Sequence, residues 1–206
     1  MLDPMTSQLD ERARRIVETA VALAERDGFA AVRLRDVAAT AQVALGTVYK
    51  RFASKEEILI AALELESDRL LGRIGRMGVP GETAEERVNN LFNVVTKGLC
   101  RKPNLARALV RSIASGDPHI TDKVASFHAM MTALTIAAIR GEAASALQTW
   151  GGDSDTRERE VAFLLQQVWF AALVGWAGGL HDVDTIIMHL SHAANMLVPH
   201  ATRPSA

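Results

Sequence analysis

Apolar residues recur at helical spacing along most of the chain, and short segments rich in Gly, Pro and Asp separate these stretches. The first stretch predicts a helix over about residues 9–27, which Gly28 ends in a left-handed conformation. Two short helices are predicted next, over about residues 34–41 and 44–51. Because no credible strand pattern is visible, the sequence predicts an all-α protein.

A longer helix is predicted to begin with a capping box. In the segment 54–57 the Ser54 hydroxyl can accept from the backbone N–H of Glu57, whose carboxylate can return to Ser54. This helix is expected to reach about Ile74, where several glycines and a proline would break it. The expected breakers are Gly72, Gly75, Gly78, Pro80 and Gly81.

Five more helices are predicted in the remainder of the chain. Their approximate ranges are 83–100, 103–115, 120–147, 156–178 and 182–197. Thr83 and Glu86 can form a second capping box. Asp155 can cap the fourth of these helices, and Pro199 is expected to close the fifth. The fourth and fifth helices are apolar nearly all round, which predicts that they are buried on more than one side.

Composition supports helices and a cytoplasmic location. Of 206 residues, 49% are hydrophobic and 5% aromatic, a balance that favours helix over strand. The single cysteine, Cys100, can form no intrachain disulfide, which is compatible with a reducing cytosol. No secretory signal and no run of about 18 apolar residues is visible, so no membrane association is expected.

A local basic patch interrupts a nearly neutral chain. The formal net charge is −1, yet the segment 33–55 carries a single acid, Asp36, among five basic residues. The basic residues are Arg33, Arg35, Lys50, Arg51 and Lys55. This pattern is typical of a protein that touches phosphates with one face only.

The basic patch coincides with the two short helices, which only residues 42–43 connect. Such a short connection is typical of a helix-turn-helix. Gly46 weakens a helix of barely two turns, but the missing side chain would let the backbone approach DNA closely. Thr47 and Tyr49 offer hydroxyls and Lys50 offers an ammonium, groups that contact phosphates or base edges.

The segment from Gly46 to Glu56 resembles the TetR family of transcriptional regulators. Its pattern is Gly-Thr-Val-Tyr-x-x-Phe-x-Ser-Lys-Glu, and the similarity extends over about residues 16–63. The resemblance implies a three-helix helix-turn-helix domain over residues 1–55. A connecting helix then leads into a larger helical domain, residues 56–206, for effector binding and dimerisation. The implied function is a homodimeric repressor on a near-palindromic DNA operator, released by a small-molecule effector.

The same resemblance implies which side chains contact DNA. They are Arg33, Arg35, Leu45, Gly46, Thr47, Tyr49, Lys50 and Lys55. Phe52 would belong to the core. The chain departs from the family at its helix ends, where Val32 and Arg33 stand in place of a Ser or Thr cap. Gln42 replaces a turn glycine and Ala44 a capping serine, so these helix ends are expected to be weaker.

Two interpretations stay open for the large apolar residues of the C-terminal part, namely a packed core or the lining of a ligand cavity. The candidate lining residues are Phe92, Leu99, Val110, Phe127, Met130, Met131, Leu134, Trp169, Leu173 and Trp176. Methionine is adaptable and large aromatic residues line many ligand sites. In the family the last two helices form a four-helix bundle with a second subunit, so the resemblance implies the same dimer here.

A further similarity is to the steroid-catabolism repressors of the TetR family. It rests on the segment RKPNLA at 101–106 followed by Ala108, and on the pair Val168-Trp169. It implies a bulky apolar effector such as a sterol-derived or fatty acyl-CoA, whose anionic part Arg107 or Arg111 would meet.

Other functions find less support. The alternative is a helical adaptor that binds a protein through the same surface, and it would lack the steep salt dependence of phosphate contacts. No nucleophile elbow or Gly-rich nucleotide loop is present, so an enzyme is not predicted. His181, His189 and His192 have neither a second Cys nor a suitably placed carboxylate nearby, so neither a metal site nor a cofactor is predicted.

Overall fold

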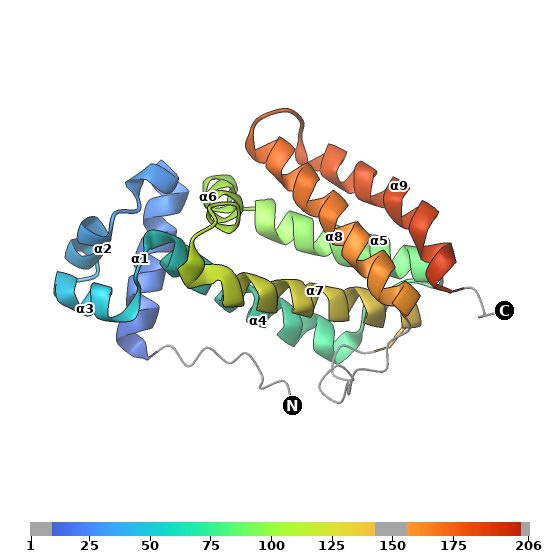
Figure 1. Cartoon of the computed structure of the whole chain (residues 1–206), viewed down its shortest axis with the longest axis horizontal. Helices are drawn as coiled ribbons and strands as arrows, with labels where there is room; N and C mark the ends of the chain where they lie inside the picture. Colours follow the sequence, from blue (N-terminus) through green and yellow to red (C-terminus); the bar gives the residue numbers. More distant parts are fainter. Residues whose placement is uncertain (1–9, 143–155, 203–206) are drawn as a thin grey trace. The chain divides into compact units, whose positions relative to one another are not determined.

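The computed structural model describes residues 10–142 and 156–202, which form nine α-helices, two short 3₁₀-helices and no strand (Figure 1). The all-α prediction is therefore confirmed for the described part of the chain. The α-helices are α1 Glu11–Asp27, α2 Leu34–Thr40, α3 Leu45–Arg51, α4 Lys55–Met77, α5 Ala84–Cys100, α6 Pro103–Ile113, α7 Thr121–Arg140, α8 Thr156–Ala177 and α9 Val183–Ala201. The 3₁₀-helices are η1 Phe29–Ala31 and η2 Pro118–Ile120.

The described residues fall into two compact units. The α1 unit contains residues 10–68 and 101–126, and the α9 unit contains residues 69–100, 127–142 and 156–202. The chain passes from one unit to the other three times: within α4, between α5 and α6, and within α7. The sequence division at residues 55/56 follows the helix-turn-helix alone, whereas the α1 unit also includes the start of α4 and all of α6.

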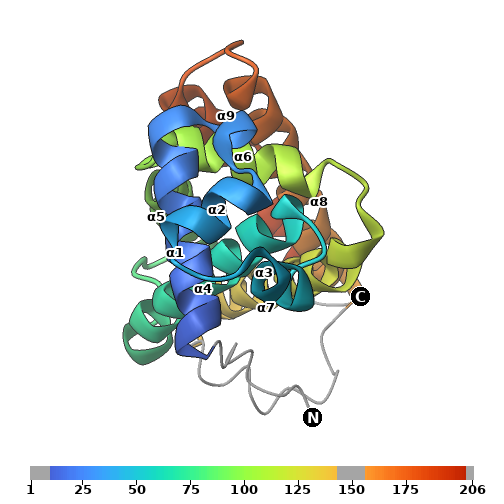
Figure 2. The same cartoon turned by 90° about the vertical axis from the view of Figure 1, so that its left-hand side faces the viewer.

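In the α1 unit, α1 packs against α2 and α6 (Figure 2). The Asp10 carboxylate caps α1 by accepting from the backbone N–H of Ala13 at 2.9 Å. Polar contacts hold the first turn of α6, since the Asn104 amide donates to the Glu25 carbonyl at 2.9 Å and the Leu105 N–H donates to the Glu25 carboxylate at 3.2 Å. The small helical unit therefore draws on a segment that is distant in sequence.

In the α9 unit, α9 packs against both α8 and α5, and α8 and α9 lie side by side (Figure 1). The Trp169 indole N–H donates to the Thr96 hydroxyl at 3.0 Å and so links α8 to α5. The Arg140 guanidinium donates to the Glu158 carboxylate at 2.9 and 2.6 Å and so links α7 to α8. Asp182 caps α9 by accepting from the Thr185 N–H at 2.8 Å.

Two helix ends differ from the sequence prediction. The helix α4 passes through Gly72 and Gly75 and ends only before Gly78, whose φ of 68° is left-handed. A helical glycine costs about 1 kcal/mol but does not block the helix, because its backbone still adopts helical angles. The helix α9 likewise continues past Pro199 to Ala201, because a proline near a helix end removes only one backbone hydrogen bond.

The predicted capping boxes form, with one change of partner. Glu86 donates its N–H to the Thr83 hydroxyl at 3.2 Å, and its carboxylate accepts from the Thr83 N–H at 3.4 Å. The Glu57 carboxylate returns to the N–H of Ala53, one residue before the predicted partner. The helix predicted over 120–147 ends at Arg140, and residues 143–147 and the proposed Asp155 cap lie outside the described residues.

By length and composition alone, α8 would suffice to cross a membrane. An 18-residue window has a mean hydropathy of 1.3, and 50% of that window is buried within the fold. A core helix of a folded domain meets the same criteria. The packing of α8 against α9 and its link to α5 through Trp169 are those of such a core helix.

Candidate DNA interface and ligand region

The corner between α2 and α3 is built on a left-handed residue. Gln42 has a φ of 55°, where the family resemblance expects a glycine. The backbone around it is bonded to α2, since the Ala41 N–H donates to the Val37 carbonyl at 2.9 Å and the Val43 N–H donates to the Ala38 carbonyl at 3.0 Å. A short helix-turn-helix corner therefore forms without glycine, at the cost of strain at Gln42.

The two short helices lack side-chain caps at their N-termini, as the sequence predicts. Arg33 precedes α2 and Ala44 precedes α3, and neither makes a capping side-chain hydrogen bond. At α3 the first bonds are made by backbone alone, with the Thr47 N–H donating to the Ala44 carbonyl at 2.8 Å. The free N–H groups at the start of α3 suit an acceptor outside the chain.

The helix α3 has one buried and one exposed side. Val48 is fully buried and Phe52, directly after the helix, is buried as predicted. Leu45 and Tyr49 are 37% and 58% exposed although both are large, and Lys50 is exposed as well. The exposed side therefore combines an apolar residue, a phenol and an ammonium.

Thr47 and Gly46 complete the predicted contact set on α3. Thr47 is half-buried and Gly46 is exposed. A Cβ atom built on Gly46 would meet no heavy atom within 4 Å, so packing within the chain does not require a glycine there. The low helix propensity of glycine at this position is instead consistent with close approach to an external partner.

Some cations of the basic patch are paired with carboxylates of the described residues and others are not. Arg33 and Lys50 are exposed and make no ion pair with any other residue that the structure describes. Arg35 is exposed and lies 3.7 Å from the Asp36 carboxylate. Arg51 pairs with Asp10, the cap of α1, so this arginine holds α3 against α1 instead of facing a partner. The sequence missed that pairing because 41 residues separate the two groups.

Lys55, the eighth predicted contact, is not a freely extended side chain. Its ammonium lies 3.8 Å from the centre of the Phe29 ring, and the Arg111 guanidinium lies 4.5 Å from the same ring. Cations are attracted to the electron-rich face of an aromatic ring. Phe29 therefore helps to hold Lys55 in position, a role that the sequence did not indicate for this residue.

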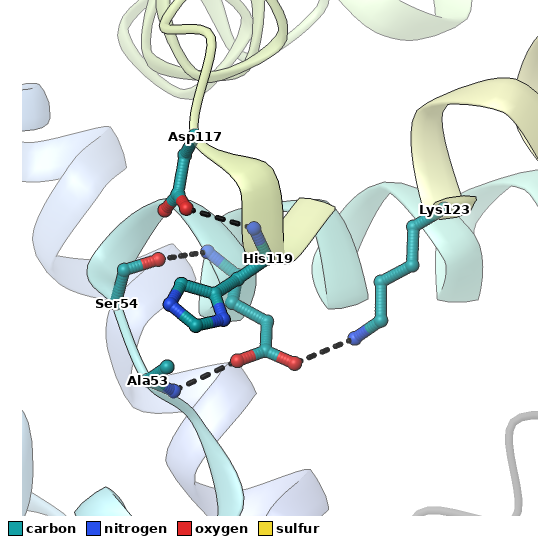
Figure 3. Close-up of polar contacts among 6 residues, drawn as sticks. Ala53, Ser54, Asp117, His119 and Lys123 are labelled. Carbon is teal, nitrogen blue, oxygen red and sulfur yellow. Dashed lines mark hydrogen bonds and ion pairs between the residues drawn. The ribbon is translucent and has the colours of Figure 1, made fainter. Parts of the chain in front are cut away.

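A polar cluster joins the beginning of α4 to the beginning of α7 (Figure 3). The Glu57 carboxylate accepts from the Ala53 N–H at 2.8 Å and from the Lys123 ammonium at 3.2 Å. Ser54 caps α4 by accepting from the Glu57 N–H at 3.1 Å. A hydrogen bond from Ser54 is the first cause that holds the pKa of Asp117 below its ordinary value, and the His119 N–H also contributes.

Two carboxyl groups further along α4 have raised pKa values. Burial raises the pKa of Glu64, an effect that Lys123 opposes and that Asp68 and Glu57 reinforce. Burial also raises the pKa of Asp68. Part of the α4 surface in the α1 unit is therefore acidic, with Lys123 as a neighbouring cation.

The predicted ligand residues fall into both units. Those in the α9 unit include an aromatic cluster, in which the Trp169 ring lies 5.8 Å from Phe92 and 6.4 Å from Phe127 between centres. Met131, Leu134, Leu173 and Trp176 are buried in this unit, whereas Leu99, Phe127 and Met130 are half-buried. Val110 is buried in the α1 unit. A role in ligand binding stays a prediction for all ten residues.

A small cleft lies between α5 and α9 in the α9 unit. Its volume is about 110 Å³, and Phe92 is the one predicted ligand residue among the described residues that line it. Most of the other lining side chains are polar, including three asparagines of α5. The sequence prediction, which considered apolar residues alone, did not point to this cleft.

The helices α8 and α9 carry most of the large apolar side chains that the described fold leaves exposed. These are Phe163, Leu164 and Val174 on α8, Met188 and Met196 on α9, and Leu180 in the connection. Both helices therefore have apolar side chains on their exposed sides as well as on their buried sides, as the sequence predicts.

Two of the C-terminal histidines, His181 and His189, pack against each other. The rings of His181 and His189 lie 5.8 Å apart, edge to face. A Cβ atom on Gly175 would fall 2.6 Å from His181 Nε2, so a larger residue there would force the imidazole to move. Among the described residues no group of three or more His, Cys, Asp or Glu is arranged to hold a metal ion.

The α1 unit therefore contains a short corner between two helices, a second helix with one buried and one exposed side, and exposed cations on this segment. These are the features of a helix-turn-helix DNA-binding protein. The chain belongs to the TetR family. Residues 16–62 match the family described as bacterial regulatory proteins of the tetR family, and residues 81–197 match the tetracycline-repressor-like C-terminal domain. Proteins of this family are ligand-responsive transcriptional regulators, and this chain is one of them.

Among curated relatives, the chain is similar to the HTH-type transcriptional repressor KstR. The Mycolicibacterium smegmatis protein is 26% identical over 194 residues, which cover 94% of this chain and 90% of the relative. The Rhodococcus jostii protein is 29% identical over 195 residues, which cover 94% and 85%.

Solved structures share the fold. A TetR transcriptional regulator from Rhodococcus superposes with a TM-score of 0.73 at 24% identity, covering 93% of this chain and 97% of that one. The Thermus thermophilus repressor FadR, solved in complex with lauroyl-CoA, superposes with a TM-score of 0.69 at 20% identity, covering 94% and 97%.

Proposed function

We propose that this regulator is a repressor that binds a near-palindromic operator as a homodimer, with α3 as the recognition helix. The main support for this proposal is that α3 has one buried and one exposed side. Val48 is buried in the core, whereas Tyr49 and Lys50 are exposed. Hydroxyl and ammonium groups bind phosphates and base edges. Arg33 and Arg35 add exposed positive charge beside this surface.

The homodimer forms through α8 and α9 in this proposal. The exposed large apolar side chains on these helices support it, since a protein surface rich in such residues is typical of an interaction site. Regulators of the family typically act as dimers. A two-fold dimer presents two recognition helices about 34–36 Å apart, one turn of B-DNA, which accounts for the near-palindromic operator. Because its partner is DNA, the protein acts in the cytoplasm.

The effector in this proposal is a small apolar molecule, of the sterol-derived or fatty acyl-CoA kind. The relatives support it, since KstR is the repressor matched over most of the chain and FadR was solved with lauroyl-CoA. The aromatic cluster of Phe92, Phe127 and Trp169 supplies apolar, polarisable surface for such a ligand.

Release from DNA requires that the effector bind one state of the protein more tightly than the other. The polar cluster in Figure 3 offers a physical link for this coupling within the α1 unit. The helix α7 continues from the α9 unit into the α1 unit, where Lys123 in its first turn binds Glu57 at the start of α4. A shift of α7 would therefore act on α4 directly after the helix-turn-helix.

The salt dependence of DNA binding tests the proposal. On a duplex recovered by selection from a random pool, Lys50→Ala should reduce the slope of log affinity against log salt by about 0.9 for each phosphate that the lysine neutralises in the wild type. Lys97→Ala is the matched control, because Lys97 is likewise an exposed lysine in the last turn of a helix. Its slope should equal that of the wild type.

An unchanged slope for Lys50→Ala would remove Lys50 from the interface. A wild-type protein that binds no duplex but captures a protein with little salt dependence would favour the helical adaptor instead.

A further inference from the structure

Two cations from separate helices lie over one aromatic ring in the α1 unit. The Lys55 ammonium is 3.8 Å from the centre of the Phe29 ring, and the Arg111 guanidinium is 4.5 Å from it. The two charged groups are therefore close neighbours, whichever faces of the ring they occupy. Lys55 begins α4 directly after the helix-turn-helix, whereas Arg111 lies in the last turn of α6.

No carboxylate of the described residues pairs with either cation. The Phe29 ring attracts cations through its quadrupole but has no net charge, so two positive charges remain side by side. Like charges repel each other, and an anion that binds both of them relieves this repulsion. The pair of Lys55 and Arg111 therefore favours an anionic partner.

The ring under the two cations is itself held in place. Phe29 is half-buried and begins η1, which packs against α6. The preceding helix α1 also lies beside α6, and Glu25 near its end bonds to the first turn of α6 (Figure 2). A long side chain that already rests on a fixed ring loses less conformational entropy when it binds a partner.

The surroundings of the pair indicate which anion it meets. Arg33 is exposed, has no ion pair among the described residues, and follows η1 after a single residue. Arg33 and Lys55 both belong to the basic patch, so Arg111 extends that patch from α2 and α4 onto α6. Several neighbouring cations suit duplex DNA, because its backbone presents a row of phosphates.

We propose that Arg111 contacts DNA and that, together with Lys55, it binds phosphates of the operator backbone. The guanidinium offers a planar fork of donors to phosphate oxygens, and the ammonium offers a point charge beside it. This proposal rests on the proposed DNA-binding function and adds α6 to an interface that the sequence placed within residues 33–55. It also gives Arg111 a different partner from the anionic part of the effector, which the family resemblance implied.

The salt dependence of operator binding tests the role of Arg111. On a duplex recovered by selection from a random pool, Arg111→Ala should reduce the slope of log affinity against log salt by about 0.9 for each phosphate that the arginine neutralises. Arg111→Lys keeps the charge and should retain most of the slope. Because Arg111 is exposed, both variants should fold, as circular dichroism can verify.

Two controls distinguish a phosphate contact from a structural role. Arg159→Ala removes an exposed arginine from α8 in the α9 unit, and its slope should equal that of the wild type. Phosphate contacts carry no sequence information. Arg111→Ala should therefore weaken binding to the selected duplex and to a scrambled duplex by a similar factor, and selection with this variant should return the wild-type motif.

An unchanged slope for Arg111→Ala, together with a reduced slope for Lys50→Ala, would overturn this proposal and leave the proposed function intact. A wild type that binds no duplex would overturn both. Saturable binding of inorganic pyrophosphate that Arg111→Ala abolishes, with an unchanged slope on DNA, would assign the pair to a small phosphate-bearing ligand instead. A changed motif for Arg111→Ala would show that the arginine supports the helix-turn-helix and does not contact phosphate.

Discussion

Gln42 shows how a single backbone angle shapes the DNA-reading corner. Its φ of 55° is left-handed, a conformation that residues with a Cβ atom adopt only at a cost. The chain accepts that cost because the buried Val37, Ala38 and Val48 fix the angle between α2 and α3. The short connection at residues 42–43 predicted the corner, and the family resemblance indicated that a glycine is missing there.

Gln42→Gly should therefore stabilise the protein. We expect the free energy of unfolding to rise by about 0.5–1 kcal/mol, because glycine relieves the left-handed strain but gains entropy when unfolded. Chemical denaturation measures the change. Gln42→Ala keeps the strain and is the matched control, so a gain of equal size in both variants would assign the effect to something other than the backbone angle.

At the scale of elements, the local signals were predictable and the long-range ones were not. The capping serine Ser54 and the limits of α2 and α3 follow from residues within a few positions. The contact of Lys123 with Glu57 joins residues 66 apart. The cations over Phe29 likewise come from α4 and α6, and no periodicity in the sequence indicates that these helices converge there.

The candidate sites follow the same rule. The exposed side of α3 could be predicted because helical periodicity separates it from Val48 and Phe52. The ligand region could not be resolved from sequence, because apolar residues that line a cavity and apolar residues that fill a core have the same pattern. The polar cleft on α5 and α9 escaped notice because its residues belong to two helices about 100 positions apart.

The half-buried carboxyl of Glu64 gives α4 a defined pH response. Burial raises the pKa of Glu64 in the folded state, so the folded protein binds this proton more tightly than the unfolded chain does. Below the unfolded pKa both states are protonated and the group has no effect. As the pH rises through the folded pKa, ionisation destabilises the folded state.

Glu64→Gln should remove this penalty. We expect the Tm of the variant to match the wild type near pH 4 and to exceed it by at most about 2–4 °C near pH 8. Thermal unfolding followed by circular dichroism across this range measures the difference. A Tm difference that shrinks or reverses as the pH rises would show that the electrostatic attraction of Lys123 outweighs burial.

At the scale of the whole molecule, the proposed function requires a dimer that forms through α8 and α9. Val174 is 45% exposed on α8, and Val94 is 48% exposed on α5. Val174→Glu would bury a charge in the proposed interface beside its two-fold copy, which should weaken the dimer by more than about 100-fold. Sedimentation velocity should then show monomers.

Val94→Glu introduces the same charge at a similar exposure outside that interface, so it should remain a dimer. If both variants stay dimeric, the interface lies elsewhere. If both dissociate, the effect of the charge is not specific to α8.

Selection of bound sequences from a random double-stranded DNA pool tests the central claim most directly. The full-length protein should enrich a near-palindrome whose half-sites lie about one helical turn apart. The double variant Thr47→Ala/Tyr49→Ala, folded as judged by circular dichroism, should enrich no motif, because both side chains lie on α3, the proposed recognition helix. Enrichment of the same motif by the variant, or of none by the wild type, would contradict the assignment of α3 as the helix that reads DNA.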